Sequence, residues 1–255
     1  IKEIDFSIST PIVRFGDKYR EEISQSKNIT LVENANLTNL GLDEQRVSSA
    51  RIENYQGNKT DVEALHFVLA MGGIENSRIL KWCNENSKGR LIDHRSPLGR
   101  YWMVHPSEYV ADALVDSDLL HNRILGLTEE VQQQLSVLNL HLWLEPTGYA
   151  DTKKLLKDLL CVAPKIGRWA AALVEKNLVC GSVVVAVWEQ EPLEENRIEL
   201  SDTKRDRFGI PRTELHFRKS ERDLFTLRET LLKLNEYLVD SNRGRLKLHD
   251  WVLGN

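Results

Sequence analysis

The stretch HFVLAMGGIENSRIL, residues 66–80, decides how this chain is expected to fold. It begins within the segment Val62–Ala70, whose last part, Leu65–Ala70, is apolar except for His66. A run this apolar predicts a strand buried on both faces, as in a parallel α/β sheet. Gly72 and Gly73 then supply a turn, and Ile74, Arg78 and Trp82, at spacings of four, predict a helix over residues 75–83. The stretch therefore predicts a strand, a Gly-Gly turn and a helix in direct succession.

The Gly-Gly turn is the first candidate functional feature. Because Gly72 and Gly73 lack side chains, a cofactor or another backbone segment can approach the end of the strand closely. The helix that follows offers unpaired N–H groups and a positive dipole end to an anion or an electron-rich ring edge. The GxGxxG fingerprint is absent from the chain. The residues alone therefore indicate either a nucleotide or flavin contact or a tight turn with no ligand.

Several further elements follow from local patterns. Residues 28–32, 37–42 and 47–55 are expected to form strands before the Gly-Gly turn. Near Pro97 the expected structure changes from a strand–helix part to a part with a sheet and helices. After this point strands are expected at 110–115, 137–144, 179–188, 197–200 and 213–217. Two helices are expected between these strands, at 152–160 and 166–176. We therefore expect two domain portions, with a boundary near residue 97.

The last helix has the clearest pattern in the chain. Ser220 and Asp223 form a capping signature at its start. Apolar residues then recur at alternating spacings of three and four, which predicts a buried stripe on one helix face. This stripe comprises Leu224, Leu227, Leu231, Leu234 and Leu238.

Aromatic and polar residues meet near the ends of two expected strands. Alternation places Trp188 and Gln190 on one face of their strand, and Trp143 and Glu145 lie near the end of another. Such an aromatic and polar face could bind a sugar by stacking and hydrogen bonding. In the alternative, the tryptophans belong to the core and the carboxylates are a solvated strand end.

Composition narrows the class of protein. The 255 residues include 34 Lys and Arg against 38 Asp and Glu, and 41% of them are hydrophobic, which is typical of a folded globular chain. Acids and bases are interspersed without a basic patch, so no nucleic acid partner is expected. The longest apolar runs fall far short of the roughly 20 residues that a membrane-spanning helix needs, so a soluble chain is expected. The three cysteines form no CxxC pair and the seven histidines have no ligand spacing, so no metal site is expected.

Three segments, in this order, resemble the glucose–methanol–choline (GMC) family of FAD-dependent oxidoreductases. They are HFVLAMGGIENSRIL (66–80), LGRYWMVHP (98–106) and EQEPLEENRIELSDTKRDRFGIPR (189–212). The sequence is most similar to the branch that contains pyranose oxidase and fructose dehydrogenase-like enzymes. The third segment is the longest and the most specific.

The resemblance implies an α+β flavoprotein. Residues 1–97 would be part of a Rossmann-like FAD-binding α/β domain. Residues 98–255 would be most of a substrate domain, with a mainly antiparallel sheet packed by helices. The parent enzyme would oxidise a CH–OH group of an alcohol or sugar by hydride transfer to flavin N5. Oxygen or another electron acceptor would then reoxidise the flavin.

The resemblance also implies site residues. Ala35 and Leu37 would lie against the adenine, and Ala70, Met71, Gly72, Gly73 and Asn76 would lie beside the FAD. The substrate contacts are expected from strand alternation, as described above, at Trp143, Glu145, Trp188 and Gln190.

No catalytic residue is assigned within the chain. The GxGxxG motif is expected upstream of Ile1 and the catalytic histidine region just beyond Asn255. Residues 1–255 alone are accordingly expected to show no turnover. The alternative reading is a non-catalytic carbohydrate-binding or structural module on a GMC-like scaffold. The sequence leaves the compartment open.

Overall fold

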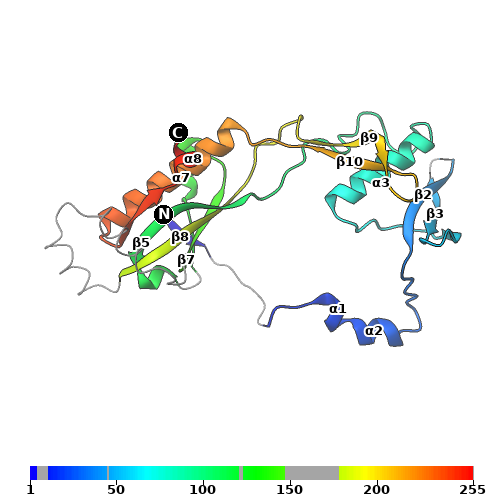
Figure 1. Cartoon of the computed structure of the whole chain (residues 1–255), viewed down its shortest axis with the longest axis horizontal. Helices are drawn as coiled ribbons and strands as arrows, with labels where there is room; N and C mark the ends of the chain where they lie inside the picture. Colours follow the sequence, from blue (N-terminus) through cyan, green and yellow to red (C-terminus); the bar gives the residue numbers. More distant parts are fainter. Residues whose placement is uncertain (5–10, 45, 121–122, 147–177, 255) are drawn as a thin grey trace. The chain divides into compact units, whose positions relative to one another are not determined.

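The computed structural model describes residues 1–4, 11–44, 46–120, 123–146 and 178–254 (Figure 1). The chain forms two compact units, each assembled from segments that are distant in sequence. The large-sheet unit consists of Ile1–Ser7, Met103–Glu191 and Lys219–Asn255, and the meander unit of Ile8–Trp102 and Pro192–Arg218. The assignment of 1–97 to a cofactor domain and 98–255 to a substrate domain stays a prediction.

The large-sheet unit is built on a six-stranded sheet with the order β1-β6-β7-β8-β5-β11. Every described pairing in this sheet is antiparallel. Its strands are β1 (Lys2–Ile4), β5 (Ser107–Asp116), β6 (Ile124–Gly126), β7 (Leu140–Pro146), β8 (Leu178–Trp188) and β11 (Gly244–Leu248). Its helices are η1 (Ser117–Leu120), α4 (Glu129–Leu135), α7 (Glu221–Asp240) and α8 (Asp250–Leu253). Helices packed with an antiparallel sheet confirm the predicted α+β class.

Helix α7 covers one face of this sheet. Its leucines at 227, 231, 234 and 238 are fully buried and pack against residues such as Leu142, Val184 and Trp188. The capping box is confirmed, since Asp223 N donates to Ser220 Oγ at 3.0 Å and Ser220 N to Asp223 Oδ2 at 2.8 Å. The prediction was wrong for Leu224, which is 42% exposed. In the first turn of α7 it lines an open groove beside α8 instead of packing on the sheet.

The meander unit contains a three-stranded antiparallel sheet, a helix and a hairpin. The sheet has the order β2-β3-β4, with β2 at Asn36–Asp43, β3 at Arg46–Glu53 and β4 at Lys59–Glu63. Helix α3 (Gly73–Asn86) packs against β2 and against the hairpin of β9 (Arg197–Arg205) and β10 (Pro211–His216). The short helices α1 (Phe15–Lys18) and α2 (Arg20–Gln25) precede the sheet in sequence. The small core of this unit comprises Leu40, Ile79, Cys83 and Ile210.

Two predicted strands are not formed. Residues 28–32 have no regular structure, and their apolar side chains Ile29, Leu31 and Val32 are exposed. The strand predicted at 62–70 ends at Glu63, and Leu65 and Val68 are 79% and 88% exposed. An apolar extended segment becomes a strand only when neighbours accept its backbone hydrogen bonds, and no described strand pairs with residues 64–70. The parallel strand pairing expected there is absent from the described residues.

The other predicted elements on described residues are confirmed, including the helix at 75–83, which lies within α3. The helices predicted at 152–160 and 166–176 lie outside the described residues. Among the described helices, none has the length and apolar character to cross a bilayer.

Candidate functional site

The Gly-Gly turn lies at the start of α3. Gly72 is the residue before the helix and has φ 86° and ψ 165°, a conformation that is essentially restricted to glycine. A Cβ added at Gly72 or at Gly73 would meet no heavy atom within 4 Å. The backbone therefore requires glycine at position 72. At position 73 the described residues leave open space where a ligand could approach.

Asn76 holds this turn in place. Its Oδ1 accepts from the Met71 N–H at 3.0 Å, and its Nδ2 donates to the Leu69 carbonyl at 3.1 Å. No side chain caps the N-terminus of α3. Met71 and Ile74 are 42% and 38% exposed. The turn thus presents backbone at an exposed helix start, a geometry that suits the edge of a cofactor.

The two predicted cofactor segments share one small core. Leu37 on β2 and Leu69, just before the Gly-Gly turn, both pack against the cluster that contains Leu40 and Ile79. Ala35 lies just before β2 and is exposed. The segments at 35–37 and 70–73 are therefore both held next to the same small hydrophobic core.

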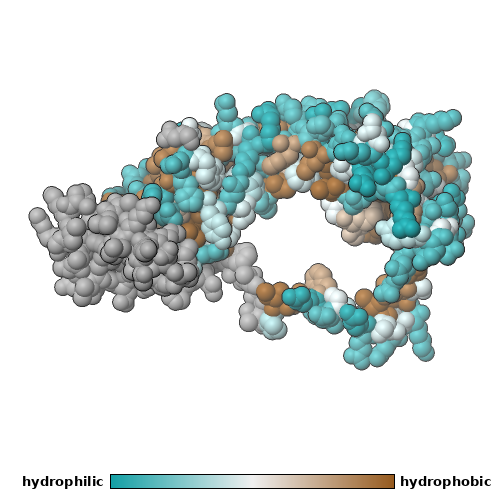
Figure 2. Space-filling view, in the orientation of Figure 1, coloured by the Kyte–Doolittle hydropathy of each residue, from teal (hydrophilic) through white to brown (hydrophobic). Residues whose placement is uncertain are grey.

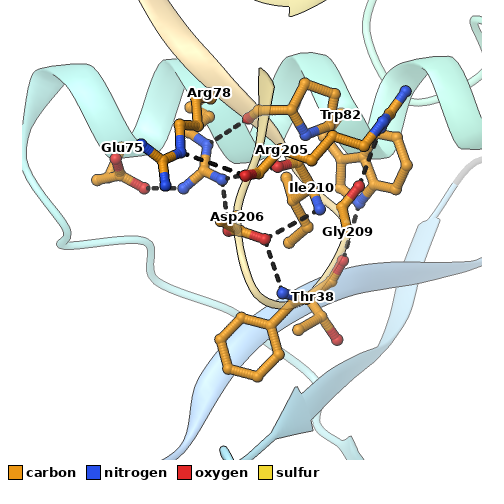
Figure 3. A network of polar contacts seen from close by, with 11 residues as sticks. Thr38, Glu75, Arg78, Trp82, Arg205, Asp206, Gly209 and Ile210 are labelled. Atoms are coloured by element: carbon orange, nitrogen blue, oxygen red, sulfur yellow. Dashed lines mark hydrogen bonds and ion pairs between the residues drawn. The ribbon is translucent and has the colours of Figure 1, made fainter. Parts of the chain in front are cut away.

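A polar network fixes α3 against the hairpin of β9 and β10 (Figure 3). Arg78 Nη2 lies 2.5 Å from Asp206 Oδ2, and Arg78 Nε donates to the Pro211 carbonyl at 2.7 Å. The other oxygen of Asp206 accepts from the N–H groups of Phe208 and Ile210 at 2.8 and 3.0 Å. Burial works against the charge of Arg78, but hydrogen bonds to carboxylates outweigh it and raise the pKa of Arg78.

Trp82, one turn after Arg78 on α3, joins the helix to the meander sheet. Trp82 Nε1 donates to the Thr38 carbonyl at 3.1 Å (Figure 3). Arg78 and Asp206 were not among the residues predicted to have a role. The available signal was the Asp-Arg-Phe-Gly stretch at 206–209, since an aspartate that binds backbone N–H groups two and four residues ahead is typical of such turns.

A second group of predicted site residues lies on the large sheet, on the face opposite α7. Trp143 and Tyr109 are both paired with Val185 on β8, so their side chains share a face of the sheet. Trp143 Nε1 donates to Glu145 Oε1 at 2.8 Å, and the Tyr109 hydroxyl donates to Glu145 Oε2 at 3.4 Å. We call Tyr109, Trp143 and Glu145 the aromatic–carboxylate cluster.

Trp188 and Gln190 lie elsewhere. Trp188 pairs with Leu140, an odd number of residues from Trp143, so the two tryptophans point to opposite faces. Trp188 is 1% exposed and packs in the core beneath α7, and Gln190 is 5% exposed. Gln190 Oε1 accepts from the Val104 N–H at 2.9 Å. Trp143 and Trp188 therefore do not share the aromatic and polar face that was predicted to bind a sugar.

Potential metal ligands are not clustered in the part of the chain that the structure describes. No group of three or more His, Cys, Asp and Glu side chains that could hold a metal ion occurs there. The two candidate sites are the Gly-Gly turn of the meander unit and the aromatic–carboxylate cluster of the large-sheet unit.

Comparison with known proteins finds similarity only among solved structures. No protein-family model and no curated protein matches the chain. A formate oxidase structure is similar with a TM-score of 0.47 and 14% identity, over 86% of this chain and 45% of the other. Two arginine variants of the Aspergillus oryzae RIB40 formate oxidase, studied for FAD modification, are similar with TM-scores of 0.44 and 0.45, each at 16% identity. They match over 84% and 85% of this chain and over 45% and 44% of theirs. The chain thus spans less than half the length of these proteins.

Proposed function

We propose that the chain is part of an FAD-dependent oxidoreductase of the GMC type that oxidises a CH–OH group of an alcohol or sugar. The observation that carries the proposal is the Gly72–Gly73 turn, where glycine is required for the backbone at one position and leaves open space at the next. The order of the three sequence motifs supports the same function.

The residues of the meander unit would position the cofactor. Gly72 and Gly73 would allow the backbone before α3 to lie against the flavin, and the segment Ala35–Leu37 would lie against the adenine. Asn76 would keep Met71 and its neighbours in the required conformation through its two hydrogen bonds. Bound FAD supplies the acceptor for the hydride, whereas the protein supplies binding, orientation and electrostatics.

The aromatic–carboxylate cluster would contact the substrate. The rings of Tyr109 and Trp143 offer apolar surfaces for stacking, and Glu145 offers acceptor oxygens for hydroxyl groups. Tyr109 is 57% exposed, which leaves this surface accessible. Oxygen or a redox partner is the proposed electron acceptor, and no nucleic acid partner is proposed.

The test is to express the chain together with the coding sequence that flanks it, and to record the flavin spectrum and dye reduction. A bound flavin and oxidation of alcohols or sugars are expected. A protein that binds no flavin and oxidises none of these substrates would contradict the proposal.

A glycine variant tests the cofactor contact itself. Gly73→Ala adds a methyl group that meets no atom of the protein, so the melting temperature should be little changed. If the flavin lies against this position, the variant should bind FAD at least ten-fold more weakly. Gly16→Ala is the matched control, since its added methyl also meets no atom within 4 Å. Equal FAD affinity in both variants would place the flavin elsewhere.

The substrate contact has a separate readout. Glu145→Gln should raise KM about ten-fold with a smaller change in kcat, because it weakens hydrogen bonds made in both the bound state and the transition state. Glu214→Gln, at an exposed position on β10, is the control and should leave KM unchanged. An unchanged KM in Glu145→Gln would remove Glu145 from the substrate site.

A further inference from the structure

Strand β4 forms the outer edge of the meander sheet. In the order β2-β3-β4, its only described strand neighbour is β3. All five of its side chains are exposed. The region of Figure 2 that corresponds to β2 and β3 in Figure 1 is largely hydrophilic. An outer strand of this kind presents backbone N–H and C=O groups that can pair with another strand.

The sequence of β4, Lys-Thr-Asp-Val-Glu, is complementary to itself when reversed. If two copies pair antiparallel around a two-fold axis at Asp61, Lys59 of each copy faces Glu63 of the other. On the opposite face of the strand, Thr60 faces Val62 in the same way. Opposite charges directly across an antiparallel pair are stabilising, and Thr and Val suit a strand.

Side chains of the neighbouring strand β3 bind charged residues of β4 in a way that is compatible with such pairing. Asp61 would face its own copy, but both of its oxygens are bound by Arg51 of β3, each at 2.9 Å. Glu53 of β3 lies 3.1 Å from Lys59. Across the joined sheet the charges would therefore alternate from Glu53 to Lys59 to Glu63 of the second copy.

We propose that β4 is a self-association edge, at which a second copy of this chain adds its β4 to give a continuous six-stranded sheet. The charge pattern favours a second copy of this chain as the partner, because each β4 strand supplies both a Lys and a Glu for the two pairs. A five-residue edge buries much less than the roughly 800 Å² per partner of a stable interface. The dimer is therefore weak and forms at high protein concentration.

The test is sedimentation velocity of the full chain over a wide range of concentration. The wild-type chain should shift from monomer to dimer, and Glu63→Lys should weaken the dimer at least ten-fold. Glu63 makes no ion pair among the described residues, so this variant should fold normally. Glu214→Lys makes the same change in net charge at an exposed position on β10 and should dimerise like the wild type.

Mixing two variants gives a more specific result. Lys59→Glu should also weaken the dimer, but an equal mixture of Glu63→Lys and Lys59→Glu should associate, since each variant supplies the charge that the other needs. Circular dichroism verifies that both are folded. A wild-type chain that remains monomeric, a Glu63→Lys dimer as stable as the wild type, or a mixture that stays monomeric would overturn the proposal.

Discussion

Arg78 makes three hydrogen bonds from α3 to residues 206–211 of the β9–β10 hairpin. Its side chain is 14% exposed and binds Asp206, Glu75 and two backbone carbonyls. Replacing it removes several charge-assisted hydrogen bonds at once and leaves Asp206 without its cation.

We expect Arg78→Ala to lower the free energy of unfolding by about 2 kcal/mol, since hydrogen bonds to charged groups contribute about 1.5–3 kcal/mol. Urea denaturation measures this change. Arg95→Ala is the control: Arg95 pairs with Asp93 at 2.8 Å, but its side chain is 80% exposed. The control should lose less than about 0.5 kcal/mol. Equal losses in the two variants would show that burial of the Arg78 pair is unimportant.

Cys83 gives the meander unit a dependence on alkaline pH. The residue is 1% exposed, and burial raises the pKa of its thiol from 9.0 to about 11. The unfolded chain therefore loses this proton at a lower pH than the folded chain. The contribution of Cys83 to stability is complete below about pH 9 and is lost as the pH rises towards about 11.

This effect is isolated by comparing the wild-type chain with Cys83→Ala. The free energy of unfolding should fall more steeply in the wild type between about pH 9 and 11, because other titrating groups are common to both proteins. Parallel curves over this range would contradict the pKa assigned to Cys83.

At the scale of single elements, helices α7 and α4 differ in whether the residue before the helix caps it with a hydrogen bond. Ser220 and Asp223 form a reciprocal capping box at the start of α7. Thr128 precedes α4 but its side chain makes no capping hydrogen bond. The same class of residue therefore stabilises one helix and not the other.

We expect Ser220→Ala to cost about 1 kcal/mol of stability, which is the usual value for a lost N-cap. Thr128→Ala removes no capping hydrogen bond and should change stability by less than about 0.5 kcal/mol. Thermal unfolding of both variants provides the comparison. A loss at Thr128 as large as that at Ser220 would mean that cap residue type, rather than hydrogen bonding, sets the stability.

At the scale of the whole molecule, each unit has a core of its own that joins distant parts of the sequence. In the meander unit, Ile210 from the β9–β10 turn packs with Leu40, Ile79 and Cys83, from much earlier in the chain. The meander unit thus depends on residues 192–218 for its core.

We expect Ile210→Ala to destabilise the meander unit by about 2–4 kcal/mol, since the side chain is 3% exposed and its removal leaves a cavity. Hydrogen exchange should become faster in β2, β3 and α3. The amides of β7 and β8, in the other unit, are the internal control and should keep their protection. Equal acceleration in both units would show that they unfold together.

The local sequence pattern was sufficient to predict elements that depend mainly on consecutive residues. The buried leucines of α7 from Leu227 onward, its capping box and the position of β7 were all predicted, because helix periodicity and strand patterns are properties of consecutive residues. The prediction of a strand over residues 64–70 was wrong, because an apolar segment is not necessarily a buried one. Burial of a strand depends on neighbours from other parts of the chain, which a local pattern cannot specify.

The sequence by itself determined the α+β class, most strand and helix positions and the Gly-Gly turn before α3, because each depends on residues adjacent in the chain. Only the tertiary structure decided that Trp143 and Trp188 lie on opposite faces, that Glu145 joins Trp143 and Tyr109, and that Arg78 binds Asp206. These relationships depend on strand register and on contacts between distant segments. A shift of one residue in register would reverse the face of every side chain in a strand, so the pairing of β7 with β8 fixes what the sequence alone left open.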